Sequence, residues 1–238
     1  MSMARKQALP PRERMVRAAA ELLATGGREA VSTRAVSAAA GVQAPAIYRQ
    51  FGDMRGLLDA AALHGFSSYL ETKRARPRED DPVDDLRRGW DHHVEFGLTN
   101  PAIYALLYGE PRPDAEPAVV REGNLILHGL VQRIAEAGRL TVGVDRAVGM
   151  VQAACKGVTL TLMGRDPATR DQGLSDATRE ALLSAITVDA ARPSARRERD
   201  GDVARRAVAL KAVLKAQAVL SPAEAVMLGE WLDRLSQG

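Results

Sequence analysis

The sequence predicts an all-α fold built from two helical modules, a small N-terminal one and a larger C-terminal one. Three observations lead to this prediction. Ala, Leu and Arg, which are good helix formers, dominate the chain. Apolar residues recur at helical spacing, and no segment alternates with period two between turn residues. Glycines and prolines divide the chain into lengths typical of single helices.

Composition limits the classes to which the protein can belong. With 46% hydrophobic residues in 238, a packed core is expected and intrinsic disorder is not. The one cysteine allows neither an intramolecular disulfide nor a Cys-rich zinc cage. No run approaches the roughly 18 apolar residues of a membrane span, and residues 1–10 lack the apolar core of a signal peptide. We therefore expect a soluble, cytoplasmic protein without a membrane partner.

The N-terminal module is predicted to contain three helices and the start of a fourth. Gly26 and Gly27 end the first helix, Ser32 caps the second between Val31 and Val36, and Asp53 caps the fourth. Pro45 falls in the first turn of the third helix, where a missing N–H costs nothing. The predicted ranges are 11–24, 32–41, 44–51 and 53–74, within a domain spanning 9–70.

A polar, proline-interrupted stretch at 75–82 separates this module from a second domain at 78–238. Asn100 followed by Pro101 predicts a helix start, and Ser221-Pro222-Ala223-Glu224 forms a capping box. The helices predicted here span 83–99, 100–108, 118–137, 145–163, 175–191, 202–219 and 222–235.

Residues 32–51 carry the most specific functional signal. Two short helices flank a tight turn at Gly41, which predicts a helix-turn-helix motif whose second helix enters the DNA major groove. Residues 1–60 hold nine Lys or Arg against five Asp or Glu, whereas the rest of the chain is nearly neutral. A basic N-terminal quarter suits contact with a polyanion.

The same stretch resembles the DNA-binding domain of the tetracycline-repressor (TetR) family. The resemblance is carried by Thr33-Arg34, Ala40-Gly41-Val42, Pro45-Ala46-Ile47-Tyr48, Phe51-Gly52-Asp53 and Leu57-Leu58, and it covers about residues 11–70. It implies a DNA-binding transcriptional regulator, commonly a repressor, that binds a palindromic operator as a homodimer and is released by a small-molecule effector.

The resemblance also implies roles for individual residues. Thr33 and Tyr48 would contact phosphates, and Arg34 would reach a phosphate or a base edge. Base readout would fall to the residues of the third helix and its cap: Gln43, Ala44, Pro45, Ala46, Arg49 and Gln50. A bidentate arginine–guanine or glutamine–adenine pair contributes about 1–3 kcal/mol of discrimination.

Two positions depart from the family pattern. Members commonly have Ser or Thr where this chain has Gln43, and a phosphate-binding Lys where it has Met54. Arg55 is adjacent to Met54 but points about 100° away on a helix, which makes it a doubtful substitute.

By the same resemblance, the second domain would supply the dimer contact and the effector pocket. The helices at about 145–163 and 175–191 are the expected dimer interface, because Gly149, Ala153, Ala154 and Gly157 permit close packing. The two C-terminal helices beyond this pair could equally join it. An apolar pocket with a few polar groups suits a hydrophobic or amphipathic effector. Its expected lining is Trp90, His93, Phe96, Tyr104, Tyr108, His128, Cys155, Thr159 and Met163.

Other readings of the sequence remain open. Asp91, His92 and Glu95 lie within about one helical turn and could bind a metal or serve an enzyme, although two ligands from one turn do not close a site. Cys155 could be a nucleophile, but no base partner is evident and a buried thiol is the default. A non-specific DNA-binding protein would need more basic residues than this chain carries. We expect no cofactor, no metal and no enzymatic activity.

Overall fold

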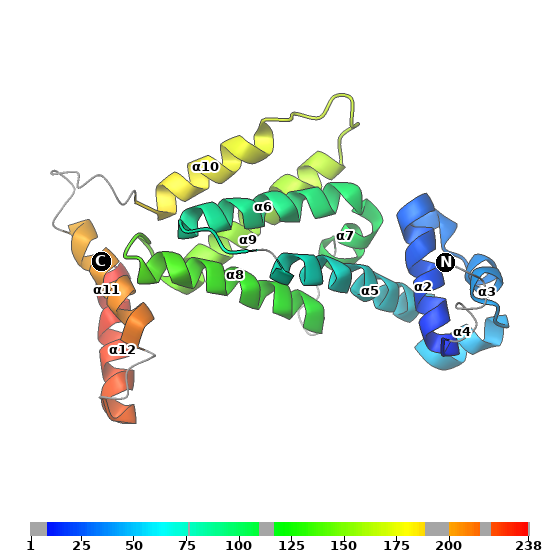
Figure 1. Cartoon of the computed structure of the whole chain (residues 1–238), viewed down its shortest axis with the longest axis horizontal. Helices are drawn as coiled ribbons and strands as arrows, with labels where there is room; N and C mark the ends of the chain where they lie inside the picture. The colour runs from blue at the N-terminus through cyan, green and yellow to red at the C-terminus, as the bar shows by residue number, and fades with distance from the viewer. Residues whose placement is uncertain (1–8, 76, 110–116, 189–199, 215–219, 238) are drawn as a thin grey trace. The chain divides into compact units, whose positions relative to one another are not determined.

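The computed structural model describes residues 9–75, 77–109, 117–188, 200–214 and 220–237. Among these residues it contains α-helices, one 3-10 turn (η1, Arg28–Ala30) and an isolated β-bridge between Leu140 and Thr187, but no strand. No helix in this part of the chain is long and apolar enough to cross a membrane. The helices are α2 (Pro11–Gly26), α3 (Thr33–Ala40), α4 (Ala44–Phe51), α5 (Met54–Ala75), α6 (Pro82–Thr99), α7 (Pro101–Tyr108), α8 (Ala118–Glu136), α9 (Val144–Met163), α10 (Leu174–Ile186), α11 (Asp200–Leu214) and α12 (Pro222–Gln237) (Figure 1). The predicted all-α class is confirmed.

The residue contacts divide the chain into two compact units. The N-terminal unit comprises residues 1–76 and 95–123, and the C-terminal unit comprises residues 77–94 and 124–238. Residues 95–123 thus group with the N-terminal helices, whereas the predicted domain boundaries place them in the second domain, 78–238. Each unit is described separately below.

The N-terminal unit begins with local signals that act as the sequence predicts. The N–H of Ala35 donates to Ser32 Oγ at 3.2 Å and caps α3, and Val31 and Val36 are both buried beside this cap. Gly27, at φ +66°, follows the last turn of α2. Because these signals are local, the first three helices form within about two residues of their predicted bounds.

The same unit holds a cluster of aromatic side chains on α5, α6 and α7. The ring centroids of Tyr69 and Phe96 are 4.5 Å apart, and those of Tyr104 and Tyr108 are 4.7 Å apart. Phe66 is buried at the centre of the cluster and contacts both groups. Asn100 begins α7, but its side chain donates to the carbonyl of Phe96 rather than capping the helix.

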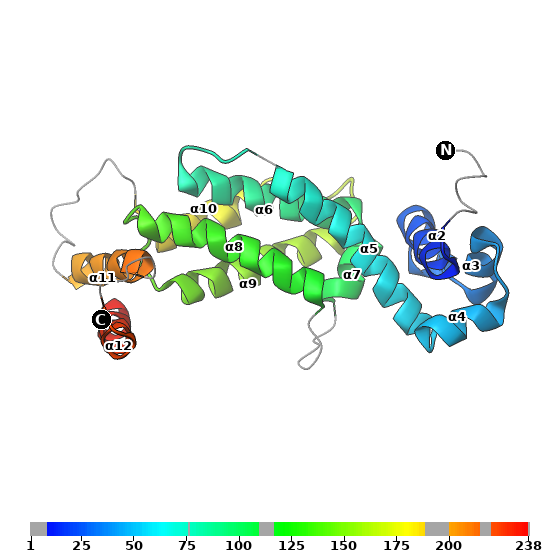
Figure 2. The same ribbon diagram turned by 60° about the horizontal axis from the view of Figure 1, so that its bottom comes forward.

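In the C-terminal unit, α6, α8, α9 and α10 lie side by side in both views (Figures 1 and 2). Trp90 Nε1 on α6 donates to Ser175 Oγ on α10 at 3.0 Å. The buried carboxylate of Asp85 accepts from Arg133 on α8, from Arg88 and from the Glu79 N–H. These hydrogen bonds and ion pairs connect α6 to α10 and to α8 around the apolar core of the unit.

One predicted helix end in this unit was wrong, and another lies outside the described residues. The helix predicted to reach residue 191 ends at Ile186, because Thr187 and Val188 leave the helix and the Val188 N–H donates to the carbonyl of Arg139 at 2.9 Å. The helix predicted over 202–219 spans Asp200–Leu214, and residues 215–219 lie outside the described residues. The last helix, by contrast, starts with the predicted capping box, since Ser221 and Glu224 exchange hydrogen bonds.

Candidate nucleic-acid interface

The geometry of α3 and α4 is set by one glycine and a small buried core. Gly41 adopts φ +63° and ψ +46°, the left-handed conformation that glycine enters without steric cost. The Val42 N–H donates back to the carbonyl of Ser37 at 3.1 Å and closes the turn. Val36 and Ile47, both fully buried, hold the two helices together. This arrangement is that of a helix-turn-helix.

The side chains predicted to contact DNA occupy the accessible side of this motif. Tyr48 is 49% exposed, and Arg34, Gln43, Pro45, Arg49 and Gln50 are also exposed, whereas Thr33, Ala44 and Ala46 are half-buried. Neither Arg49 nor Pro45 is packed into the body of the unit. The recognition helix α4 therefore presents a surface that a duplex groove can reach.

Thr33 at the start of α3 and Tyr48 on α4 are brought together. Their hydroxyl oxygens are 3.2 Å apart, and either can donate. Two neighbouring exposed hydroxyls form a small polar site suited to a phosphate oxygen, because each can turn its O–H toward an acceptor. Because the two residues are 15 positions apart in the sequence, their proximity could not be predicted from the sequence alone.

The C-terminal end of α4 is braced from two sides. Gly52 follows it at φ +78°, and Asp53 Oδ1 accepts from the Gly56 N–H at 2.7 Å, which confirms the predicted cap of α5. The Arg12 guanidinium on α2 lies 5.1 Å from the centroid of the Phe51 ring. Sequence reasoning missed Arg12 as a neighbour of α4, and the N-terminal excess of basic residues was its only signal.

Both departures from the family pattern are visible in the structure. Gln43 occupies the N-cap of α4 without a side-chain hydrogen bond to the helix, as expected of a poor capping residue. Met54 is half-buried, while Arg55 on the next position is exposed. Arg55, the exposed cation at the start of α5, thus follows by one residue the position at which family members commonly have lysine, which is Met54 here.

The residues predicted to line an effector pocket are distributed over both units. Phe96, Tyr104 and Tyr108 join the aromatic cluster of the N-terminal unit. Trp90, His93, His128, Cys155, Thr159 and Met163 belong to the C-terminal unit. There Trp90, Cys155 and Thr159 are buried, and Thr159 Oγ1 donates to the Cys155 carbonyl at 2.7 Å. As a lining of one pocket, this set remains a prediction.

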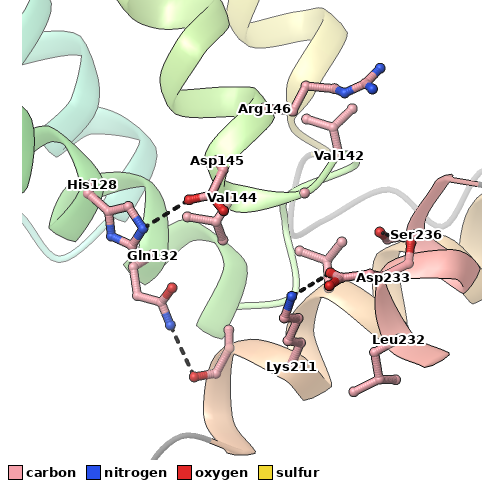
Figure 3. Close-up of a pocket in the computed structure, with 13 residues that line it drawn as sticks. His128, Gln132, Val142, Val144, Asp145, Arg146, Lys211, Leu232, Asp233 and Ser236 are labelled. Carbon is pink, nitrogen blue, oxygen red and sulfur yellow. Dashed lines mark hydrogen bonds and ion pairs between the residues drawn. The ribbon is translucent and has the colours of Figure 1, made fainter. Parts of the chain in front are cut away.

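A cavity of about 560 Å³ lies elsewhere in the C-terminal unit, between α8, the start of α9, α11 and α12 (Figure 3). It shares only His128 with the predicted set. His128 Nε2 lies 3.4 Å from Asp145 Oδ1, Lys211 forms an ion pair with Asp233, and Gln132 donates to the carbonyl of Ala212 at 3.0 Å. The sequence could not reveal this cavity, because it depends on how α11 and α12 pack.

The metal alternative gains no support from the described residues. Asp91 forms an ion pair with Arg179, and burial raises the pKa of the Asp91 carboxyl even though this arginine opposes the shift. In this part of the chain no three His, Cys, Asp or Glu side chains gather as metal ligands would. Among the described residues, Asp91, His92 and Glu95 are therefore not part of a group of three or more side chains that could hold a metal ion.

Comparison with known proteins agrees with this geometry. Residues 15–61 match the family model described as "Bacterial regulatory proteins, tetR family". The class C tetracycline repressor protein of Escherichia coli is 40% identical over 78 residues, which cover 33% of this chain and 35% of that protein. The match thus spans about a third of the length of this curated relative.

Solved structures share the fold over a larger part of the chain. A tetR family transcription regulator from Shewanella sp. PV-4, described as putative in its own structure report, has a TM-score of 0.56 at 15% identity and covers 76% of this chain and 100% of that one. RolR, solved with its ligand resorcinol, has a TM-score of 0.60 at 19% identity and covers 80% and 93%. The segment that contains the helix-turn-helix, residues 15–61, is thus similar to the tetR family of bacterial regulatory proteins.

Proposed function

We propose that the protein is a transcriptional repressor that binds a palindromic operator as a homodimer and is released by a small-molecule effector. The observation that carries this proposal is α4, held on a buried Ile47 with Tyr48, Arg49 and Gln50 exposed. An α-helix presented in this way fits the major groove of B-DNA. The family is one of regulatory proteins rather than enzymes.

The proposed DNA contacts fall into two classes. Thr33 and Tyr48 bind phosphate, supported by their adjacent hydroxyls, and Arg34 reaches a phosphate or a base edge. Arg49 and Gln50 read base edges, and the half-buried Ala44 and Ala46 let the helix approach closely, with Gln43 and Pro45 at its start. Phosphate contacts set register, and base contacts set sequence preference.

A homodimer follows from the small footprint of one short helix. Two recognition helices spaced about 34–36 Å apart read two half-sites on one face of the duplex. We place the interface on α9 and α10. Along α9, Gly149, Ala153, Gly157 and Leu160 are exposed, and a Cβ added at either glycine would meet open space. On α10, Ala177, Ala181 and Ala185 are exposed as well.

The effector is proposed to be a hydrophobic or amphipathic molecule, bound by residues of the predicted aromatic and polar set. The buried aromatic rings of Phe96 and Tyr104 provide apolar contact area, and ligand binding is compatible with this fold because RolR was solved with resorcinol. Binding would shift the population away from the DNA-competent state. The proposed division of labour is DNA binding by residues 9–70 and effector binding and dimerisation by residues 78–238.

Selection of random duplex DNA by the full chain, followed by sequencing, tests the DNA-binding proposal. We expect enrichment of a palindrome whose half-site centres are one helical turn apart, and a gel shift with the duplex next to the coding region. An Arg121→Ala variant, altered at an exposed cation on α8, is the matched control and should bind unchanged. Equal retention of all sequences would overturn the proposal.

A further inference from the structure

A cation from α2 lies beside the C-terminal end of α4. Arg12 is the second residue of α2, and its side chain is exposed. Its guanidinium carbon lies 5.1 Å from the centroid of the ring of Phe51, the last residue of α4. A cation–π contact of this kind favours one position of the charge and leaves the N–H donors of the guanidinium to other acceptors. Arg12 is therefore held next to α4 as a hydrogen-bond donor.

The acidic residues next to Arg12 and next to the end of α4 have other partners. Glu13, the acidic residue in the first turn of α2, accepts from Arg17 at 2.7 Å. Asp53 accepts from the Gly56 N–H. Within the residues that the structure describes, no carboxylate forms an ion pair with Arg12. An exposed guanidinium of this kind is suited to an anion from another molecule.

Arg12 lies on the side of α4 that carries the paired hydroxyls. Tyr48 and Phe51 are three residues apart on this helix, so their side chains are neighbours, separated by about 4.5 Å along the helix axis. The hydroxyl oxygen of Tyr48 is 3.2 Å from that of Thr33. One side of α4 thus presents two hydroxyls and then a cation, which are groups that bind backbone phosphates beside a groove.

We infer that Arg12 binds a phosphate of the DNA backbone at the C-terminal end of α4, separate from the phosphate proposed for Thr33 and Tyr48. The inference rests on the proposed DNA binding and adds a residue from outside the helix-turn-helix. Met54, at the position where family members commonly have a phosphate-binding lysine, is neutral and half-buried, and Arg12 supplies a cation to the same end of α4. The contact is charge-assisted and carries no sequence preference.

The salt dependence of DNA binding tests this contact, with a fluorescein-labelled random-sequence duplex as the probe. Each neutralised phosphate releases counterions, so the logarithm of the affinity falls with that of the salt concentration by about 0.9 per contact. We expect Arg12→Gln to reduce this slope by about 1 for each bound chain and to weaken binding about tenfold at low salt. Arg121→Gln removes an exposed cation from α8 and is the matched control, with an unchanged slope. An unchanged slope in Arg12→Gln overturns the inference.

A second variant separates the charge of Arg12 from its packing on Phe51. Arg12→Lys keeps a cation at this position, so it should keep the salt slope and a larger share of the affinity than Arg12→Gln. The melting temperature of both variants should change little, because Arg12 is exposed. If Arg12 only braced α4, both variants would melt earlier and bind more weakly with the slope of the parent, and that result overturns the inference.

Met54→Lys tests whether Arg12 acts at the end of α4. In the Arg12→Gln background it should restore the slope of the parent, because it returns a cation to the region beside Phe51. A slope that stays low contradicts the assignment of the phosphate to this region. A parent chain that binds no duplex at any salt concentration contradicts the repressor proposal as well. Binding by the parent with a slope indifferent to Arg12 contradicts this inference alone.

Discussion

Thr33 and Tyr48 place their hydroxyl oxygens 3.2 Å apart, although they lie on different helices. Both residues are predicted to bind phosphate, and their proximity favours one shared contact over two separate ones. A single phosphate oxygen could accept from both hydroxyls, which would fix the register of α4 along the groove. This relationship leads to the first prediction.

Tyr48→Phe removes one donor without changing the ring. We expect operator affinity to fall by about 1–2 kcal/mol, because a hydrogen bond to a charged acceptor is lost. Since phosphates carry no sequence information, affinity for scrambled DNA should fall by the same factor. Fluorescence anisotropy with both duplexes measures this, and a Thr33→Val, Tyr48→Phe double variant should show a non-additive loss. A loss confined to the operator would instead assign Tyr48 to a base.

Arg49→Ala should act differently. If Arg49 pairs with a base, affinity for the operator falls by about 1–3 kcal/mol and one operator position becomes degenerate in selection sequencing. The melting temperature should stay constant, because Arg49 is exposed. A uniform loss across all duplexes, with every position still selected, would make Arg49 a phosphate contact.

Gly41→Ala tests the turn of the motif. A Cβ at φ +63° is strained, and we expect about 1–2 kcal/mol of lost stability together with weaker DNA binding. The nearest atom to the added Cβ is Arg14 Nη1 at 3.7 Å, so conformational strain rather than a clash is responsible. Gly129→Ala on α8, where space is open, should be neutral or slightly stabilising. Equal effects of the two substitutions in thermal unfolding would contradict this explanation.

Asp85→Ala tests the buried ion pair of the C-terminal unit. Its removal leaves the Glu79 N–H without its acceptor and takes the paired carboxylate from Arg133. We expect a loss of about 3 kcal/mol, at the lower end for buried pairs because Arg133 stays partly solvated and keeps its hydrogen bond to the Glu79 carbonyl. Asp84→Ala is the matched control, since Asp84 is also in the first turn of α6 but exposed. Its loss should stay below about 1 kcal/mol. Urea unfolding of both variants measures the difference.

Acid should destabilise the C-terminal unit. The hydrogen bond from Arg139 lowers the pKa of Asp81, and that from Arg87 lowers the pKa of Glu180. Carboxyls with a lowered folded-state pKa stabilise the protein above their unfolded pKa, near 4, and this contribution is lost as pH falls through the folded value. Melting temperature should therefore drop below about pH 4.

The Asp81→Asn, Glu180→Gln variant provides the control for the acid effect. The asparagine oxygen can still accept from the Val83 N–H, as Asp81 does at 2.7 Å, so the start of α6 is kept while the titrating groups are removed. Its melting temperature should be lower than that of the parent at pH 7 and should depend less on pH. Parallel pH profiles for the variant and the parent would assign the acid effect to other groups.

The helix-turn-helix was predictable because its determinants are local. Ser32, Gly41 and Asp53 each act within four residues of their position, so the sequence alone defines the ends of α3 and α4. The burial of Ile47 follows from the same local spacing. The resemblance to the family then assigned a proposed phosphate or base contact to the exposed residues of the motif.

Features that depend on distant segments were not predictable. The end of α10 is set by the pairing of Val188 with Arg139, which are 49 residues apart in sequence. The cavity of Figure 3 and the exposure of apolar side chains on α11 and α12 depend on which sides of these helices are buried. No sequence pattern distinguishes the covered apolar side of such a helix from the uncovered one.

Cys155 is the single thiol of the chain and is buried in α9. A cysteine engineered at an exposed position of α4, such as Gln50, would consequently be the one site open to maleimide dyes without removing the native residue. Each copy in a homodimer would then carry one fluorophore. Energy transfer between the two dyes would report the distance between the two α4 helices as candidate effectors are added.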